Sequence, residues 1–351
     1  MHLDPVHGET WREIEADGLR IEERVYGRVA GDSLAAMAAS VGLYLFGMSH
    51  AIARLKPDIV LVLGDRGEQL AGAMAAAFQN IPVVHLCGGA LSGSIDDSIR
   101  HAITKFAHFH LPGFEEHARR IMQMGEPPDR IQTVGLPGGN IRPDTVFSRD
   151  QICSRLNLPS DLPYLLVVQH PVTQNKTQAG EQIEETLAAL AQLEYPALLA
   201  NPNDDAGGRE ILARMRLYTD RHSHLHLLPP PGSRELFASI MAHAGALVGN
   251  SSSALVEAMS VCLPVVNIGD RQRGREHLAC WINVGYDRHE IREAINSALF
   301  APGYRQQLAE FGHRMPHRDT EARILRLLLS LDLSAGLRPK SFCDLEGKDG
   351  R

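Results

Sequence analysis

The chain has 351 residues, enough for about two domains of roughly 150 residues, and its 44% hydrophobic and 22% charged residues are ordinary for a globular protein. Its net charge of −7 argues against nucleic-acid or membrane-surface partners, because phosphate groups favour a basic face. No apolar run approaches the roughly 18 residues that a membrane span needs, and the N-terminus has no basic segment followed by an apolar one, so we expect neither a span nor a secretory signal. Five scattered cysteines, never spaced as CxxC, favour reduced thiols in a cytoplasm and no zinc site of the usual spacing.

Short apolar runs alternate with amphipathic stretches in the first half of the chain. Helical spacing of apolar residues over 34–55 predicts a long helix. Aliphatic runs at 59–63 and 82–87 predict strands on either side of a helix over 69–78, and 96–108 predicts a further helix. Strands that alternate with helices in this way predict βαβ units and a parallel sheet covered on both faces.

The second half repeats this rhythm after a polar linker expected at 142–161. The fold class is therefore α/β, with two Rossmann-like domains in tandem and a cleft between them. Ligands in such sheets bind outside the carboxyl ends of the strands. The expected strands are 164–169, 197–200, 225–228, 246–248 and 264–268, and the expected helices are 178–193, 208–219, 233–243 and 251–260. The expected domains are 1–145 and 160–320, followed by a closing helix at 321–335 and a poorly ordered tail at 336–351.

Two loops of the second half have the composition of an anion site. The strand at 246–248 runs into Gly-Asn-Ser-Ser-Ser at 249–253 and then a helix that carries Glu257. A helix N-terminus with its free N–H groups suits a diphosphate, although Ser251 alone would also explain a plain helix cap. The loop at 268–275 holds three arginines within five residues, which a solvated basic loop would also explain. Together the two loops predict an anion site.

Several motifs occur in an order that resembles a known family. They are Gly64-Asp65-Arg66, the block 96–105 (Asp-Asp-Ser-Ile-Arg-His-Ala-Ile-Thr-Lys), His170-Pro171-Val172-Thr173, Asn250-Ser251-Ser252-Ser253 with Glu257, and the block 267–275 (Asn-Ile-Gly-Asp-Arg-Gln-Arg-Gly-Arg). In this arrangement the chain resembles the hydrolysing UDP-N-acetylglucosamine 2-epimerases of sialic acid biosynthesis from about residue 1 to about residue 330. The resemblance implies the fold of the B-type glycosyltransferases (GT-B), with UDP held mostly by the C-terminal domain.

The same resemblance implies roles for particular side chains. Ser251 and Ser252 would bind the diphosphate and Glu257 the ribose. The other substrate-binding positions that it implies are Arg66, Asn203, Asp205, Arg271 and Arg275. His85 stands in an apolar strand, where it is either buried or lines the cleft, and we add it as a substrate-binding candidate.

The family reaction is an elimination of UDP, with loss of the C2 proton, followed by addition of water that gives N-acetylmannosamine. Such chemistry needs a base for the proton and donors for the departing phosphate, but no cofactor and no metal. The resemblance implies that Asp65 and Asp96 are catalytic, and we add Arg100 and His170 as catalytic candidates. A turn cap at Asp65, a helix N-cap at Asp96 and a loop histidine at His170 are the simpler explanations of the same residues.

The chain departs from the family pattern at two places. Cys87 and Ala90 stand where the family typically has a glutamate or histidine and a glutamate, and alanine has no acid–base group. The sequence also starts after the position of the family's first strand, so we expect either a start that lies upstream of Met1 or a truncation. These departures keep open a catalytically impaired UDP-sugar-binding homologue, and the serine loop keeps open a GT-B glycosyltransferase.

The remaining expectations concern the metabolism, location, oligomeric state and partners of the protein. The resemblance implies a hydrolase and isomerase of nucleotide-sugar and amino-sugar metabolism that acts in the cytoplasm as a homodimer or homotetramer. A UDP-sugar is the expected partner, and no nucleic acid or membrane is expected.

Overall fold

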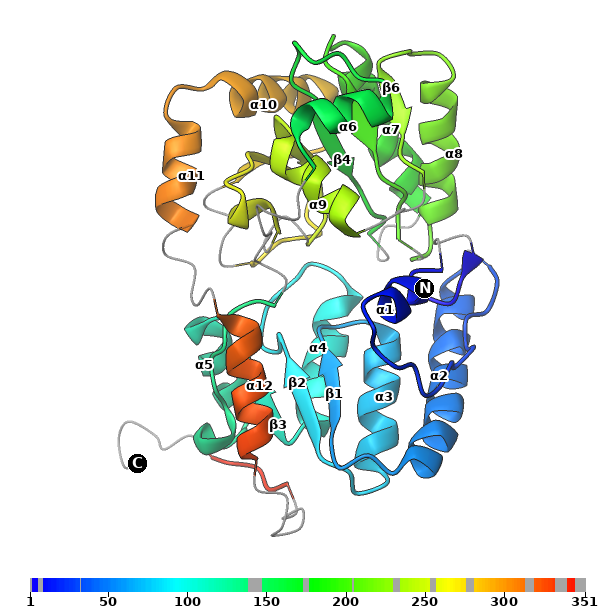
Figure 1. The fold of residues 1–351 in the computed structure, drawn as a ribbon, viewed down its shortest axis with the longest axis vertical. Coiled ribbons are helices and arrows are strands. Elements are labelled where there is room, and N and C mark those ends of the chain that lie inside the picture. Colours follow the sequence, from blue (N-terminus) through cyan, green and yellow to red (C-terminus); the bar gives the residue numbers. More distant parts are fainter. Residues whose placement is uncertain are drawn as a thin grey trace. The chain divides into compact units, whose positions relative to one another are not determined.

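A computed structural model describes residues 2–5, 9–31, 33–137, 147–172, 177–203, 205–229, 234–252, 257–275, 281–312, 319–331 and 340–344. The chain forms two compact units, each with its own parallel sheet (Figure 1). The N-terminal-sheet unit comprises residues 22–29, 38–137 and 315–351, and the C-terminal-sheet unit comprises residues 1–21, 30–37 and 138–314. Neither unit is a continuous stretch of chain, whereas the domains expected from the sequence are. Those expected boundaries stay a prediction.

The N-terminal-sheet unit contains three parallel strands in the order β1-β2-β3 within its described residues. These are β1 (Val60–Leu63), β2 (Val83–Leu86) and β3 (Phe109–Leu111). The first two were expected from their aliphatic runs. Leu61 and Leu63 of β1 are 44% and 49% exposed. The expected absence of a preceding strand stays a prediction.

Alternate residues of β2 face opposite layers of this unit, as a strand with a period of two requires. Val83 packs with Val62 and with helices α2, α3 and α4. Val84 and Leu86 face the other way and pack with Ile324 of helix α12. This register directs His85, next to Val84, towards the α3 and α4 side. The helices are α2 (Leu34–Leu55), α3 (Gly67–Ala77), α4 (Ile95–Phe106) and α12 (Thr320–Ser330).

The C-terminal-sheet unit contains six parallel strands in the order β6-β5-β4-β7-β8-β9 within its described residues. Their core positions are aliphatic on both faces, which is typical of a parallel sheet covered by helices. On β4, Leu165 and Val167 pack on the side of α7 (Ala179–Ala191), α8 (Gly208–Thr219) and α10 (Arg288–Phe300). Leu166 and Val168 pack on the side of α6 (Arg149–Leu156) and α9 (Arg234–His243). The strands are β4 (Leu165–Val168), β5 (Ala197–Leu199), β6 (Leu225–Leu227), β7 (Ala246–Gly249), β8 (Val265–Ile268) and β9 (Ile282–Val284).

Part of the stretch expected to be a linker forms a helix, and the linker assignment itself stays a prediction. Helix α6 (Arg149–Leu156) begins at a capping box in which Ser148 and Gln151 bond each other's backbone N–H groups. The helix expected at 251–260 lies partly outside the described residues. The other helices are α1 (Trp11–Ala16), α5 (Glu115–Gln123), α7 (Ala179–Ala191), α8 (Gly208–Thr219), α9 (Arg234–His243), α10 (Arg288–Phe300), α11 (Tyr304–Gly312) and the 3₁₀ turn η2 (Pro128–Arg130).

The described part of the expected tail, residues 340–344, is docked rather than loose. The Lys340 ammonium donates to the backbone carbonyls of Thr104, Lys105 and Ala107 at 2.7, 2.9 and 2.6 Å. It also pairs at 2.7 Å with Glu126, a fully buried carboxylate. Because a cation at a helix C-terminus satisfies the last carbonyls, this contact caps α4. The prediction of disorder was therefore wrong for this segment.

Helix α2 is long and apolar enough to cross a membrane by length and composition alone, with a mean hydropathy of 1.4. It is the single such helix among the described residues, and the sequence predicted the helix itself but no membrane span. Core helices of globular proteins pass the same test, so this helix is weak evidence for a span. Its residues Leu45, Met48 and Ile52 pack on the N-terminal sheet.

Candidate functional site

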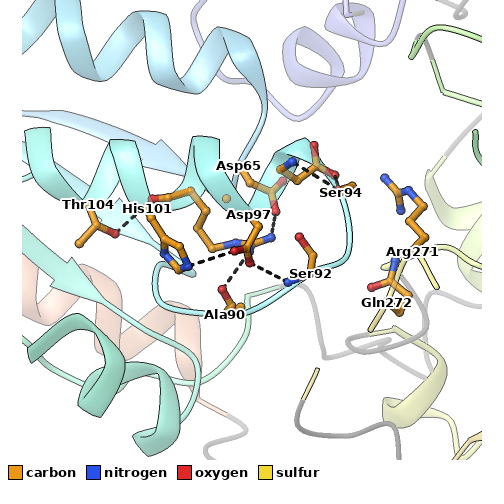
Figure 2. Close-up of polar contacts among 12 residues, drawn as sticks. Asp65, Ala90, Ser92, Ser94, Asp97, His101, Thr104, Arg271 and Gln272 are labelled. Atoms are coloured by element: carbon orange, nitrogen blue, oxygen red, sulfur yellow. Dashed lines mark hydrogen bonds and ion pairs between the residues drawn. The ribbon is translucent and has the colours of Figure 1, made fainter. Parts of the chain in front are cut away.

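The N-terminal-sheet unit gathers charged groups at the carboxyl ends of its strands, around Arg100. This side chain is 1% exposed, and its guanidinium forms an ion pair with Asp65, which follows β1 (Figure 2). It also donates to the Ala90 carbonyl at 2.9 Å and lies 3.5 Å from the Asp97 carboxylate. Arg100 therefore ties the loops after β1 and β2 to the first turns of α4. A side chain this buried holds the surrounding loops together, and the catalytic role predicted for Arg100 stays a prediction.

The start of α4 orders a second pair of carboxylates. Ser94, not Asp96, is the N-cap, since its side chain accepts from the Asp96 backbone N–H. The Asp96 carboxylate accepts a 2.8 Å hydrogen bond from the Ser94 hydroxyl. The Asp97 carboxylate accepts from the Ser92 N–H at 2.8 Å and lies 3.5 Å from His101. Asp65 and Asp96 are thus both partly exposed groups at the same edge of the sheet.

His85 lies beneath this edge and is fully buried. Its ring Nε2 is 2.8 Å from the Gly64 carbonyl, and its Nδ1 is 3.4 Å from the Thr104 hydroxyl. Burial lowers the pKa of His85 to about 4, so the ring is neutral near pH 7 and Nε2 carries the proton that it donates to Gly64. The substrate-binding prediction for His85 is not tested. In this position the ring fixes the turn that carries Asp65.

Cys87 and Ala90, the two departures from the family pattern, lie on the loop after β2. Cys87 is half-buried and adopts a left-handed backbone with φ of +61°. Ala90 is buried and contributes its backbone carbonyl, which Arg100 bonds. Gly89 between them is required, because a Cβ there would lie 2.4 Å from the His117 carbonyl oxygen. The loop is therefore held by backbone contacts that do not depend on the side chains at 87 and 90.

The C-terminal-sheet unit places polar, mostly uncharged groups at its strand ends. His170 follows β4, and its ring Nδ1 lies 3.1 Å from the backbone N–H of Asn203, which follows β5. The Asn203 amide donates to the Asp205 carboxylate at 2.6 Å. The side chain of Asn250, which follows β7, bonds the backbone of His170 twice. These bonds join three neighbouring strand ends of one sheet.

The loops expected to hold an anion lie in the same unit. Ser251 is buried and Ser252 exposed just after β7, while Glu257 is half-buried, and burial raises the pKa of its carboxyl. The Arg271 guanidinium donates to the Asn250 carbonyl at 3.2 Å. Gln272 donates to the same oxygen at 2.7 Å.

The predicted positions thus fall into two groups, one in each unit. Asp65, Arg66, Asp96, Arg100 and, beneath them, His85 belong to the N-terminal-sheet unit. The C-terminal-sheet unit holds His170, Asn203, Asp205, Ser251, Ser252, Glu257, Arg271 and Arg275.

Sequence reasoning missed three residues that organise these groups. Asp97 holds the Ser92 loop, Asn250 joins the ends of β4 and β8, and Gln272 supports the Asn250 carbonyl. Their partners in the fold lie 5, 80 and 22 positions away in the chain. Asp97 and Asn250 stand inside recognisable motifs, and Gln272 inside the arginine loop, but no spacing signal separates them from their neighbours.

Two α/β units, each with its own parallel sheet, place the chain in the GT-B fold class. A sequence profile described as "UDP-N-acetylglucosamine 2-epimerase" matches residues 1–329. The chain belongs to the UDP-N-acetylglucosamine 2-epimerase family.

Curated relatives cover most of the chain. The UDP-N,N'-diacetylbacillosamine 2-epimerase (hydrolyzing) of Legionella pneumophila is 36% identical over 308 residues, which are 86% of this chain and 80% of the relative. The GDP/UDP-N,N'-diacetylbacillosamine 2-epimerase (hydrolyzing) of Campylobacter jejuni is 35% identical over 277 residues, 78% of this chain and 72% of the relative. The UDP-N-acetylglucosamine 2-epimerase of Neisseria meningitidis is 30% identical over 299 residues, 85% of this chain and 78% of the relative.

A solved structure supports the same fold class. The crystal structure of UDP-GlcNAc 2-epimerase from Neisseria meningitidis bound to UDP-GlcNAc matches with a TM-score of 0.76 at 17% identity. The match covers 93% of this chain and 90% of that one. At 17% identity the match shows the fold alone, and it confirms the expected GT-B class.

Proposed function

We propose that this chain is a hydrolysing 2-epimerase that converts a 2-acetamido UDP-sugar into UDP and the free sugar epimerised at C2. With UDP-N-acetylglucosamine the sugar product is N-acetylmannosamine. The observation that carries the proposal is the family match over residues 1–329, because this stretch includes every polar group of both unit sites.

The proposed reaction has two balanced steps. A base takes the C2 proton, the C2–H electrons form the C1–C2 double bond, and the bond from C1 to the phosphate oxygen breaks to release UDP. Water then adds across the double bond, with hydroxyl to C1 and a proton to the opposite face of C2. General acid–base groups and anion donors are sufficient for this sequence.

The acid–base work is proposed for Asp65 and Asp96. Both carboxylates are partly exposed at the carboxyl edge of the N-terminal sheet, where Arg100 and Ser94 fix their orientations. Cys87 is the third group at this edge, and its half-buried thiol is compatible with binding. The loop that carries it keeps its backbone contacts.

UDP binding is proposed for the C-terminal-sheet unit. Ser251 and Ser252 offer hydroxyl and backbone donors for the diphosphate, and Glu257 offers an acceptor for the ribose. Arg271 and Arg275 supply positive charge for the diphosphate. His170 is proposed as a catalytic group that donates a hydrogen bond to the reacting sugar. Arg66, Asn203 and Asp205 complete the proposed substrate-binding set.

A variant series tests the acid–base assignment. Asp65→Asn and Asp96→Asn should each lower kcat by about 100-fold or more, which is the usual contribution of a general acid or base. Asp129→Asn, at an exposed acid of the same unit, is the matched control and should leave kcat unchanged. A chain that releases UDP equally fast with asparagine at both positions 65 and 96 would refute this assignment.

The identity of the amino sugar is a separate question. The relatives at 36% and 35% identity carry names for N,N'-diacetylbacillosamine nucleotides, and the relative at 30% carries a name for UDP-N-acetylglucosamine. We propose the shared chemistry, a 2-acetamido group next to C1, as what the site requires. Comparing kcat/KM for both UDP-sugars decides which of them is preferred, and UDP-glucose, which lacks the acetamido group, should not turn over. Equal turnover of UDP-glucose would refute the substrate class.

Further expectations about context complete the proposal. A relative from Escherichia coli at 31% identity is named polysialic acid biosynthesis protein P7, which supports a place in sialic-acid-type amino-sugar metabolism. We propose a cytoplasmic hydrolase and isomerase without cofactor or metal, and without nucleic-acid or membrane partners. The exposed apolar side chains Leu43 and Phe46 of α2 support a homodimer or homotetramer. Light scattering on purified protein would test this, and a monomer at micromolar concentration would refute it.

A further inference from the structure

Asn250 occupies a position between two loops of the proposed UDP-binding unit. It is 2% exposed, and its side chain bonds both backbone polar groups of His170. The Asn250 Oδ1 accepts from the His170 N–H at 2.7 Å, and the Asn250 Nδ2 donates to the His170 carbonyl at 2.9 Å. The carboxamide is thus oriented unambiguously, with one donor and one acceptor each matched to a backbone partner.

The sheet topology explains why a residue 80 positions away reaches His170. Strand β7 lies between β4 and β8, and the Asn250 N–H continues the β4–β7 ladder by donating to Val168 at 3.1 Å. Gly249 makes this close approach possible, because a Cβ there would lie 2.2 Å from the Val168 carbonyl oxygen. Asn250 therefore leaves β7 directly beside the loop that carries His170.

The backbone of Asn250 connects to the loop on its other side. Its carbonyl oxygen accepts from the Arg271 guanidinium at 3.2 Å and from the Gln272 amide at 2.7 Å. Both donors follow β8, the neighbour of β7. One residue thus bonds the loop after β4 through its side chain and the loop after β8 through its backbone.

The ring of His170 is fixed from a third strand end. The Asn203 N–H donates to His170 Nδ1 at 3.1 Å, and a ring nitrogen that accepts a hydrogen bond carries no proton. The neutral ring therefore has its proton on Nε2, which presents a donor rather than an acceptor. If the backbone of His170 shifts, the ring loses this alignment with Asn203.

We propose that Asn250 is a positioning residue that holds His170 in its Nε2–H tautomer and in register with Arg271. The proposal rests on the proposed function, because it assigns His170 a donor role toward the UDP-sugar. Asn250 acts through His170 and does not itself contact substrate. The consequence is that removing its carboxamide changes turnover through the ring of His170, while the Arg271 contact, made to the backbone carbonyl, remains.

Three variants separate positioning from general loss of stability. Asn250→Ala removes both bonds to His170, and Asn250→Asp keeps an acceptor for the His170 N–H but loses the donor to its carbonyl. Asn267→Ala is the matched control. Asn267 is 4% exposed on β8, and its amide donates at 2.9 Å to Asn283 rather than to any loop of the site.

Kinetics give the first readout. Asn250→Ala should lower kcat by up to about 100-fold, as expected for a misplaced catalytic group, while the Kd for UDP changes by less than about threefold. Asn267→Ala should lower the unfolding midpoint but leave kcat and the UDP Kd at wild-type values. Equal losses of kcat and UDP affinity in Asn250→Ala, or equal kcat losses in the control, would overturn the proposal. If Asn250→Ala does not fold, Asn250→Asp takes its place with the same expected split.

The tautomer gives the second readout, which a purely structural role would not change. Ring ¹⁵N signals of histidine-labelled protein, with His170 identified by its absence in His170→Asn, should show an unprotonated Nδ1 and a protonated Nε2 in the wild type. Asn250→Ala should show averaged signals from both tautomers. Identical His170 signals in both proteins would overturn the proposal. This spectrum needs no substrate, so a wild-type chain that fails to release UDP from any 2-acetamido UDP-sugar refutes the proposed function while the spectrum still decides the role of Asn250.

Discussion

The two proposed sites, one in each unit, are built from different kinds of interaction. The one in the N-terminal-sheet unit centres on a buried cation, Arg100, which holds Asp65 and Asp97 through charge. The one in the C-terminal-sheet unit centres on Asn250, whose neutral amide bonds the backbone of His170 and whose carbonyl accepts from Arg271 and Gln272. The proposed chemistry explains this difference, since proton transfer needs carboxylates held in defined positions, whereas UDP brings its own negative charge. Removing one member of a buried charged network should lower the free energy of unfolding more than removing one member of a neutral network. The predictions below follow this order, from the largest effect to the smallest.

The largest loss of stability is expected for Arg100→Met. Arg100 is 1% exposed, so its removal leaves Asp65 and Asp97 without their shared cation and should lower the free energy of unfolding by about 3–5 kcal/mol. Arg54→Met, in the same unit, is the control. Arg54 is exposed and bonds Glu23 through two nitrogens at 2.9 and 2.8 Å, so its loss should cost at most about 1 kcal/mol. Similar losses in urea unfolding of both variants would contradict the comparison.

The next largest effect is a pH dependence set by buried histidines. Burial lowers the pKa of His85 to about 4, and burial with nearby Lys340 lowers that of His108 to about 4. Since the unfolded histidines titrate near 6.5, the unfolded chain binds more protons below that pH, and stability falls as the pH drops from about 6.5 to about 4. The share from His85 is about 3 kcal/mol over this window.

His85→Gln tests the share of one histidine. Glutamine keeps an amide donor for the Gly64 carbonyl but does not titrate, so the variant should show a shallower loss of stability between pH 6.5 and 4. Urea midpoints measured across this window provide the readout. An unchanged slope would mean that His85 is not the titrating group.

A smaller effect is expected at the docked C-terminal segment. Lys340→Met removes the ammonium that caps α4 and pairs with Glu126, which should lower stability by about 1–3 kcal/mol. Ser341→Ala, an exposed neighbour in the same segment, should have no effect. Faster proteolysis near residue 340 in the lysine variant should accompany its lower midpoint. Equal midpoints for both variants would show that the contact does not stabilise the unit.

The smallest effect belongs to the neutral network. The Thr186 hydroxyl is fully buried and donates at 2.8 Å to Gln169, the residue before His170. Thr186→Val loses this uncharged bond at nearly constant volume and should cost about 1 kcal/mol of stability. A loss as large as that of Arg100→Met would remove the contrast between the sites of the two units.

The sequence predicts the positions of strands and helices better than it predicts the contacts that the loops make. Periodicity located thirteen of the strands and helices to within two residues at each end, such as α8 at Gly208–Thr219, because aliphatic runs and amphipathic spacing are local signals. Strands β3 and β9 were missed because each has three residues with a polar residue at its centre. Helix α6 was missed because it is polar, although the capping box at Ser148 and Gln151 is a readable signal.

The site residues divide in the same way. Motif order, through the family resemblance, pointed to Asp65, Asp96 and the serine and arginine loops, which follow strands or begin a helix. It did not predict that the buried Arg100 pairs with Asp65 or that the Asn250 side chain bonds the backbone of His170. These partners lie 35 and 80 residues away in the chain. The order of the strands in the sheet determines which loops meet, and the local sequence does not show that order.

The central claim is that the chain inverts C2 of a 2-acetamido UDP-sugar through loss and return of its proton. Proton NMR of the purified protein with UDP-N-acetylglucosamine, and separately with UDP-N,N'-diacetylbacillosamine, in deuterated water tests it directly. The account predicts UDP together with a free sugar that is epimerised and deuterated at C2, from at least one of the two substrates. Release of an unepimerised sugar that keeps its C2 proton, or no release of UDP from either substrate, would contradict it.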